Sequence, residues 1–165
     1  MVWAAESSGL DITQQIAIGS AAIIGHNWPI FLRFYGGRGI GTTIGVILIL
    51  PLINDLTPWI PVAFLSILAI GTLILRSSPV PAFVGVMSLP VASWVFHEPL
   101  STTLGFLAIF LIIVAKRLTA PTSADTTSVS KGLLLLNRLL FDRDIRNREV
   151  WMYQNPIRQY EQRKD

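Results

Sequence analysis

The sequence predicts an all-α fold: a polytopic bundle of about five transmembrane helices, followed by a cytoplasmic amphipathic helix and tail. Three observations predict it. Of the 165 residues, 52% are hydrophobic and only 14% are charged, whereas a soluble domain usually has about 25% charged residues. The apolar residues fall into five stretches separated by short polar loops. All but three of the 13 cations lie at or after Lys116.

Each apolar stretch has nearly the length of a membrane-crossing helix, which needs about 20 residues (range about 17–25). Within the fourth stretch, Pro79 and Pro81 suit the first turn of a helix, and Pro90 predicts a kink. The five stretches are, in order, roughly residues 16–32, 39–53, 59–75, 79–96 and 100–115.

The loops between these stretches alternate in charge. Cytoplasmic loops of membrane proteins carry an excess of Lys and Arg. The cationic loops would therefore be cytoplasmic, and the N-terminus would lie outside. In order, the loops contain Arg33 and Arg38, then Asp55, then Arg76, then His97 and Glu98, and finally Lys116 and Arg117.

The chain is expected to divide into a transmembrane domain, residues 1–118, and a cytoplasmic part, residues 119–165. Residues 120–130 are rich in Pro, Ser and Thr and are predicted to be a linker. Residues 131–154 place apolar side chains at near-helical spacing with arginines after them. This pattern predicts an amphipathic helix that either meets membrane lipids at the cytoplasmic surface or docks on the bundle.

Composition also excludes several classes of function. The net charge of +3 belongs to the C-terminal tail, and a nucleic-acid binder needs a basic face on a folded module, so no nucleic-acid partner is expected. The absence of cysteine excludes disulfides and thiolate chemistry. His97 and Glu98 lack a second histidine four residues on, so no metal site is expected. The N-terminus does not have the pattern of a signal peptide.

The stretch FLRFYGGRGIGTT, residues 31–43, interrupts this apolar chain with two arginines and four glycines. Glycine backbone can approach a ligand closely, the start of the next helix offers N–H groups, and a guanidinium grips phosphate. These features predict a phosphate-binding loop, and its candidate residues are Arg33, Gly36, Gly37, Arg38, Gly39 and Thr42. The alternative is close helix packing through Gly37, Gly41 and Gly45, with the arginines marking the cytoplasmic edge.

Residues 25–45, GHNWPIFLRFYGGRGIGTTIG, resemble the second signature of the bacterial acyl-phosphate:glycerol-3-phosphate acyltransferases, an integral-membrane family. Its pattern is similar to G-H-x-F-P-x-F-x-x-F-x-G-G-K-G-x-A-T-x-x-G. Arg38 stands at the usual lysine and Gly41 at the usual alanine. Ten residues match in register: Gly25, His26, Pro29, Phe31, Phe34, Gly36, Gly37, Gly39, Thr42 and Gly45.

The resemblance implies transfer of a fatty acyl group from acyl phosphate to glycerol 3-phosphate, giving lysophosphatidic acid for phospholipid biosynthesis. Arg38 and His26 are the candidate catalytic residues, and no cofactor is implied. For His26 the alternative is a helix–helix hydrogen bond that orders the loop. Asn27, next to it, is expected to make a packing hydrogen bond rather than to bind a ligand. Arg76 is a further candidate phosphate contact, or simply an anchor at the membrane surface.

The family has seven spans and three signature loops, so this chain is expected to lack two N-terminal helices and the first signature. Of the third signature, Arg138, Leu139 and Leu140 remain, with Asp144 at its acidic position. Three alternatives therefore stay open. The first is a truncated product whose missing helices a partner supplies. The second is a non-catalytic relative that binds phosphorylated lipid precursors, and the third is a small transporter subunit.

Overall fold

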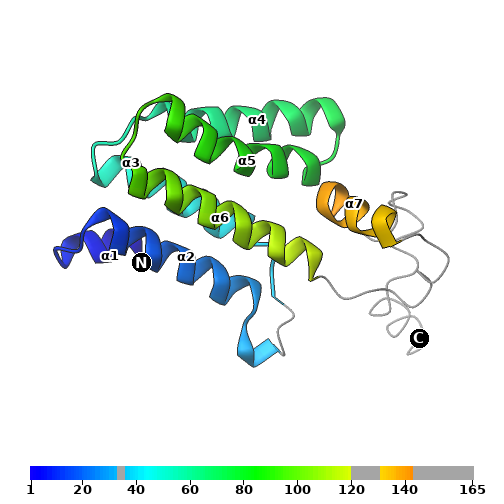
Figure 1. The fold of residues 1–165 in the computed structure, drawn as a ribbon, viewed down its shortest axis with the longest axis horizontal. Helices are drawn as coiled ribbons and strands as arrows, with labels where there is room; N and C mark the ends of the chain where they lie inside the picture. The colour runs from blue at the N-terminus through cyan, green and yellow to red at the C-terminus, as the bar shows by residue number, and fades with distance from the viewer. Residues whose placement is uncertain (33–35, 120–130, 143–165) are drawn as a thin grey trace. The chain divides into compact units, whose positions relative to one another are not determined.

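The computed structural model describes residues 1–32, 36–119 and 131–142. The described residues are helical or lie in short connections. The chain separates into two compact units, Met1–Lys116 and Arg117–Asp165. The helices are α1 (Val2–Ser7), α2 (Ile12–Asn27), a short 3-10 helix η1 (Ile30–Leu32), α3 (Ile40–Ile53), α4 (Trp59–Leu75), α5 (Pro79–Val95), α6 (Leu100–Leu118) and α7 (Lys131–Phe141) (Figure 1).

The first apolar stretch forms a helix with other ends than the sequence predicts. It begins at Ile12 because the Asp11 side chain accepts from the Gln14 N–H and the Gln14 side chain accepts from the Asp11 N–H, a capping box. It ends at Asn27 because Trp28 precedes a proline and leaves the helical region, at φ −127° and ψ 64°. The expectation of a helix through residue 32 is therefore wrong. Helix α1 was not predicted.

In the first unit, α4 and α5 form an antiparallel pair, side by side in Figure 1. Two glycines allow the close approach. A Cβ on Gly71 would lie 2.8 Å from the Pro81 ring, and one on Gly85 would lie 3.0 Å from the Phe64 ring. Small residues at helix interfaces let apolar helices pack closely. At Pro90, where the sequence predicts a kink, α5 remains helical and continues to Val95.

Helix α6 packs against both α2 and α5. A Cβ on Gly105 would lie 2.5 Å from the Ile16 side chain of α2. Toward α5, the hydroxyls of Ser93 and Thr103 are 2.8 Å apart and share a hydrogen bond. The core of this unit draws on all of the helices from α1 to α6, and its fully buried members include Ile23, Ile47, Leu50, Ile60, Phe64, Val86, Leu89, Phe106 and Ile109.

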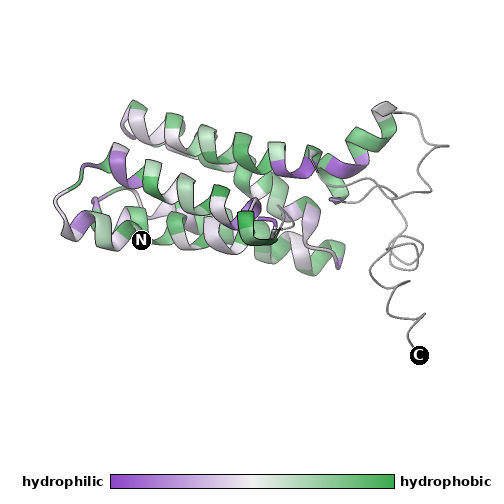
Figure 2. Ribbon diagram, turned by 90° about the horizontal axis from the view of Figure 1, so that it is seen from below, coloured by the Kyte–Doolittle hydropathy of each residue, from purple (hydrophilic) through white to green (hydrophobic). Residues whose placement is uncertain are grey.

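The outward faces of these helices are apolar as well. Leu52 of α3, Leu73 and Ile74 of α4, and Val91 of α5 are each more than half exposed. Figure 2 shows hydrophobic residues along most of the length of the helices. Among the described residues, α6 is the one helix long and apolar enough to cross a membrane; α3, α4, α5 and residues Gly132–Phe141 are apolar but shorter.

One end of the first unit is joined by side-chain hydrogen bonds, and we call it the hydrogen-bonded end: Asp11, Gln15, Asn54, Thr57 and Glu98. Gln15 Nε2 donates to the Leu10 carbonyl at 2.9 Å, and Asn54 Nδ2 donates to Gln15 Oε1 at 2.7 Å. The Thr57 N–H donates to Glu98 Oε1 at 2.7 Å. These bonds tie the start of α2, the end of α3 and two interhelical loops together.

In the second unit, α7 and the end of α6 each contribute an arginine that donates hydrogen bonds to carbonyls at the end of the other helix. Arg117 Nη1 donates to the carbonyls of Leu139 and Leu140, the latter at 3.3 Å. Arg138 Nη1 donates to the Leu118 carbonyl at 3.4 Å. The last carbonyls of a helix lack intrahelical partners, and cations near them are favourable. Each helix end is thus stabilised by an arginine of the other. The predicted linker and the tail after Asp142, including Asp144, lie outside the described residues.

Candidate functional site

The candidate site lies where α2 ends and α3 begins. We call it the glycine junction: His26 and Asn27 at the end of α2, and Gly36–Gly39 before α3. The Gly37 N–H donates to the His26 carbonyl at 3.1 Å. The loop therefore folds back onto the end of the helix that precedes it, and this return brings Gly39 to the start of α3.

The glycines of this loop are required by close contact. A Cβ on Gly36 would overlap the carbonyl oxygens of both His26 and Asn27, and one on Gly37 would overlap the His26 ring. Gly39 has φ +72°, in the left-handed region that favours glycine. By contrast, a Cβ on Gly25 or Gly41 would meet nothing within 4 Å. A Cβ on Gly45 would also meet nothing within 4 Å. The alternative explanation, close helix packing through Gly37, Gly41 and Gly45, therefore has no support at Gly41 or Gly45.

Helix α3 begins without a side-chain cap, because its N-cap residue is Gly39. The first N–H groups of a helix have no intrahelical partner, and the N-terminus carries about half a positive charge. Arg38 is exposed directly beside this helix start. An uncapped N-terminus next to a guanidinium is an arrangement that binds phosphate or another anion.

The side chain of Asn27 is fully buried beside Gly39, with 0% of its surface exposed. A Cβ on Gly39 would lie 2.6 Å from Asn27 Oδ1 and 2.9 Å from Nδ2. Neither amide atom has a hydrogen-bond partner among the described residues, and the same holds for the Thr43 hydroxyl in the first turn of α3. Leaving a buried polar group unpaired costs about 1–3 kcal/mol. The junction thus contains buried polar groups that no other described residue satisfies.

Lys116, near the end of α6, fixes the Asn27 main chain. Its ammonium donates to the Asn27 carbonyl and lies 5.3 Å from the centroid of the Trp28 ring. A cation stabilises a helix C-terminus and is attracted to an indole face. Ile113, one turn earlier on α6, lies next to Gly39, 3.0 Å from where a Cβ would be. Helix α6 therefore supports both sides of the junction.

His26 lies in the last turn of α2 with an exposed side chain. Its ring nitrogen Nε2 points at Gly37, where a Cβ would collide with it. The imidazole is thus part of the junction. In the sequence, His26 falls within the first apolar stretch, residues 16–32, and in the structure it lies in the last turn of α2.

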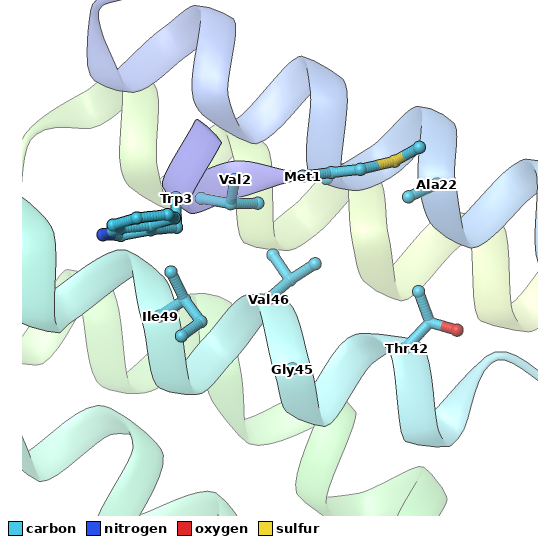
Figure 3. Close-up of a pocket in the computed structure, with 9 residues that line it drawn as sticks. Met1, Val2, Trp3, Ala22, Thr42, Gly45, Val46 and Ile49 are labelled. Atoms are coloured by element: carbon cyan, nitrogen blue, oxygen red, sulfur yellow. The ribbon is translucent and has the colours of Figure 1, made fainter. Parts of the chain in front are cut away.

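Thr42 faces a different space from Asn27. It lines a cavity of about 420 Å³ between α1, α2 and α3. Figure 3 shows Thr42, Val46 and Ile49 projecting from successive turns of α3 toward α1 and Ala22 of α2. Met1, Val2 and Trp3 form the opposite wall. The cavity is mainly apolar and adjoins the first turn of α3 through Thr42.

Two further residues, Arg33 and Arg76, are predicted from the sequence as phosphate contacts. Arg33 is not among the described residues. Arg76 is exposed at the C-cap of α4, with φ 47°. Within the described ranges, no group of three or more His, Cys, Asp or Glu residues could hold a metal ion.

Sequence reasoning missed two residues of the junction. Lys116 was interpreted only as a cytoplasmic charge, and Asn27 as a packing residue. The signal for Lys116 was available: it ends an apolar helix on the same predicted side as Arg38. The signal for Asn27 was weaker, because an asparagine in the last turn of a helix is common and only the fold shows that its amide meets Gly39.

Together these observations define a class: an all-helical, apolar protein in which a glycine-rich loop joins two helix ends beside an exposed arginine. Residues 1–120 match the family model described as glycerol-3-phosphate acyltransferase. The chain belongs to that family of integral membrane proteins.

Two relatives from Dehalococcoides mccartyi extend the match beyond these residues. The chain is 42% identical over 156 residues to glycerol-3-phosphate acyltransferase 4 of strain CBDB1, covering 89% of this chain and 63% of the relative. It is 42% identical over 161 residues to glycerol-3-phosphate acyltransferase 5 of strain ATCC BAA-2266, covering 94% and 66%.

A more distant relative, the glycerol-3-phosphate acyltransferase of Laribacter hongkongensis, is 35% identical over 102 residues, covering 59% of this chain and 47% of the relative. The chain thus spans less than two thirds of the length of the curated relatives it matches. No solved structure matches it.

Proposed function

We propose that this chain transfers a fatty acyl group from acyl phosphate to glycerol 3-phosphate, giving lysophosphatidic acid for phospholipid biosynthesis. The observation that carries the proposal is the uncapped start of α3 beside Arg38. Both substrates contain phosphate, and this arrangement binds phosphate. Family membership and the names of the relatives point to the same substrate.

The proposed setting is the cell membrane, crossed by a bundle of about five helices, α2 to α6. Helices of 14–19 residues are about 21–28 Å long at about 1.5 Å per residue, against about 30 Å of hydrocarbon. Their exposed apolar side chains suit lipid better than water. In this proposal the glycine junction and the C-terminus are cytoplasmic and the N-terminus is outside, which the alternating charges of the loops support.

In the proposed reaction, the 1-hydroxyl of glycerol 3-phosphate attacks the carbonyl carbon of the acyl phosphate. The new C–O ester bond forms, the bond from carbonyl carbon to phosphate oxygen breaks, and inorganic phosphate leaves. Arg38 and the N–H groups at the start of α3 neutralise the phosphate charge as it grows. Acyl phosphate is already activated, so positioning and electrostatic stabilisation supply most of the rate.

The other predicted site residues take supporting roles in this proposal. Gly36, Gly37 and Gly39 bring the backbone close to the phosphate, and Arg33 adds a polar contact. Thr42, which the sequence predicts as a further contact, lines the apolar cavity instead. His26, whose ring lies against Gly37, accepts the proton that the hydroxyl releases. The acyl chain lies along the apolar helices, among membrane lipids.

The test is acyl transfer by the purified chain in lipid, given palmitoyl phosphate and labelled glycerol 3-phosphate. Arg38→Ala is compared with Arg38→Lys, which keeps the charge and restores the residue usual at this position of the signature. We expect labelled lysophosphatidic acid from the parent and Arg38→Lys, with at least about tenfold less from Arg38→Ala, or about 1.4 kcal/mol at the barrier.

Other outcomes identify the alternatives. Product that Arg38→Ala does not reduce would keep the activity and remove the phosphate role of Arg38. No product from a folded parent that still binds glycerol 3-phosphate would indicate a non-catalytic relative, or a chain that needs a partner to supply further helices. Solute flux in proteoliposomes without acyl product would indicate a transporter subunit.

A further inference from the structure

We propose that Asn27 is a further substrate-binding residue, whose side-chain amide donates a hydrogen bond to a substrate phosphate at the start of α3. This inference rests on the proposed function, because it names a group of the same phosphate site. The sequence assigned Asn27 only to helix packing, and it occupies a variable position of the signature pattern.

The first observation is the unsatisfied state of the amide. Asn27 Nδ2 and Oδ1 are buried, and neither has a partner among the described residues. Buried polar side chains nearly always have a partner. At the hydrogen-bonded end, the amides of Gln15 and Asn54 follow that rule. An amide that no described protein group satisfies is a group available to a ligand.

The second observation is where the amide lies. The position of a Cβ on Gly39 is within 3 Å of both amide atoms, and Gly39 is the N-cap of α3. In many helices the side chain of the N-cap residue fills this space and accepts a hydrogen bond from one of the first N–H groups. Here an amide from another helix occupies it. A phosphate oxygen held by those N–H groups is therefore adjacent to Asn27 Nδ2.

A third observation explains how the amide keeps its position. The main-chain carbonyl of Asn27 accepts from Lys116, and the preceding carbonyl, of His26, accepts from Gly37. The residue is therefore held from α6 and from the loop at once. The atoms that cover the amide include the Gly39 backbone, and glycine rotates at little steric cost. A small rotation at Gly39 brings a phosphate oxygen to the amide.

Both substrates carry a phosphate, so the experiment has one arm for each. Binding of labelled glycerol 3-phosphate and of palmitoyl phosphate is measured on the full chain in lipid nanodiscs, for the parent and for Asn27→Leu. Leucine is similar in size and has no donor. The matched control is Thr102→Val, which removes another buried hydroxyl without a partner in the described part of the chain, in the first turn of α6.

We expect Asn27→Leu to weaken binding of one of the two phosphates by about tenfold or more, and Thr102→Val to leave both unchanged. Because leucine removes an unsatisfied buried amide, the thermal midpoint of Asn27→Leu should equal or exceed that of the parent. The ligand whose affinity falls is the one whose phosphate Asn27 binds. Unchanged affinity for both ligands in a folded Asn27→Leu protein would overturn the proposal.

A second variant keeps the test decisive if leucine prevents folding. Asn27→Asp retains the shape but places a carboxylate beside the phosphate, and like charges repel. Weaker phosphate binding by Asn27→Asp supports the proposal, and equal or tighter binding overturns it. Since binding is measured apart from transfer, a chain that binds phosphate through Asn27 without making product would contradict the proposed reaction alone.

Discussion

The polar side chains at the two ends of the first unit differ in their hydrogen bonding. At the hydrogen-bonded end, Asp11, Gln15, Asn54 and Glu98 each have hydrogen-bond partners at 2.7–3.0 Å. At the glycine junction, α3 begins without a side-chain cap. There the Asn27 amide and the Thr43 hydroxyl have no partner in the parts of the chain that the structure describes.

We expect this difference to separate the residues that stabilise the fold from those that bind substrate. Satisfied hydrogen bonds hold the helix ends and loops in place, and each contributes about 0.5–1.5 kcal/mol. An unsatisfied buried group lowers stability unless a ligand pairs with it. Thr102, in the first turn of α6, is also unpaired among the described residues, so it is the position beside Gly39 that distinguishes Asn27. The charged residues follow the same division: the cations Arg38 and Lys116 belong to the junction, whereas the acids Asp55 and Glu98 lie at the other end. Substitutions at the two ends should therefore change different measurements.

The largest effect is expected from Gly36→Ala at the junction. The added Cβ overlaps two main-chain oxygens, which cannot move away as a flexible side chain could. The loop must shift, at a cost of about 1–3 kcal/mol in stability, and Arg38 moves with it. We expect kcat/KM for acyl transfer to fall at least about 100-fold. Near-normal activity in a folded Gly36→Ala protein would show that the loop geometry is unimportant.

A smaller effect is expected from Lys116→Met, which keeps the length of the side chain and removes its charge. The Asn27 carbonyl loses its donor and Trp28 loses the ammonium above its ring. We expect kcat/KM to fall about tenfold, with Lys116→Arg recovering most of it. If Lys116→Arg is as impaired as Lys116→Met, a positive charge at this position is not what holds the junction.

At the opposite end, Glu98→Ala should affect stability alone. It removes the acceptor of the Thr57 N–H, which lies in a partly exposed loop, so we expect a loss of about 1 kcal/mol in the free energy of unfolding. Kinetic constants measured below the unfolding transition should stay within about twofold of the parent. A kinetic change comparable to that of Lys116→Met would contradict the separation of the two ends.

The smallest effect is expected from Gly41→Ala, the matched control for Gly36→Ala. A Cβ here meets nothing within 4 Å and the residue lies in the first turn of α3. Alanine should raise stability by about 0.5–1 kcal/mol, observed as a higher thermal midpoint, with activity unchanged. Loss of activity would mean that the start of α3 must itself be flexible.

The sequence predicted the helices well where apolar length alone decides them. The expected stretches 39–53, 59–75 and 79–96 match α3, α4 and α5 to within a residue at each end. It failed at the ends of α2 because the capping box and Pro29 outweigh the apolar pattern of residues 16–32. Helix α1 has only six residues, too few for periodicity to show.

For the site, the sequence identified the loop but not its surroundings. Glycines, an arginine and a helix start are adjacent along the chain, so Gly36–Gly39 could be selected by local pattern. Lys116 is far from Asn27 in sequence, and their contact exists only because α6 returns beside α2. The choice between Thr42 and Thr43 as the group nearer the junction also needed the fold, since one faces a cavity and the other is buried.

The lysine above Trp28 also provides an optical signal. Indole emission responds to a nearby charge, and Trp28 adjoins Asn27 at the base of the loop. The chain has five tryptophans, so replacing the other four with phenylalanine would leave one native fluorophore next to the junction. Its spectrum would then change on phosphate binding, and occupancy could be followed in real time without labelled lipid.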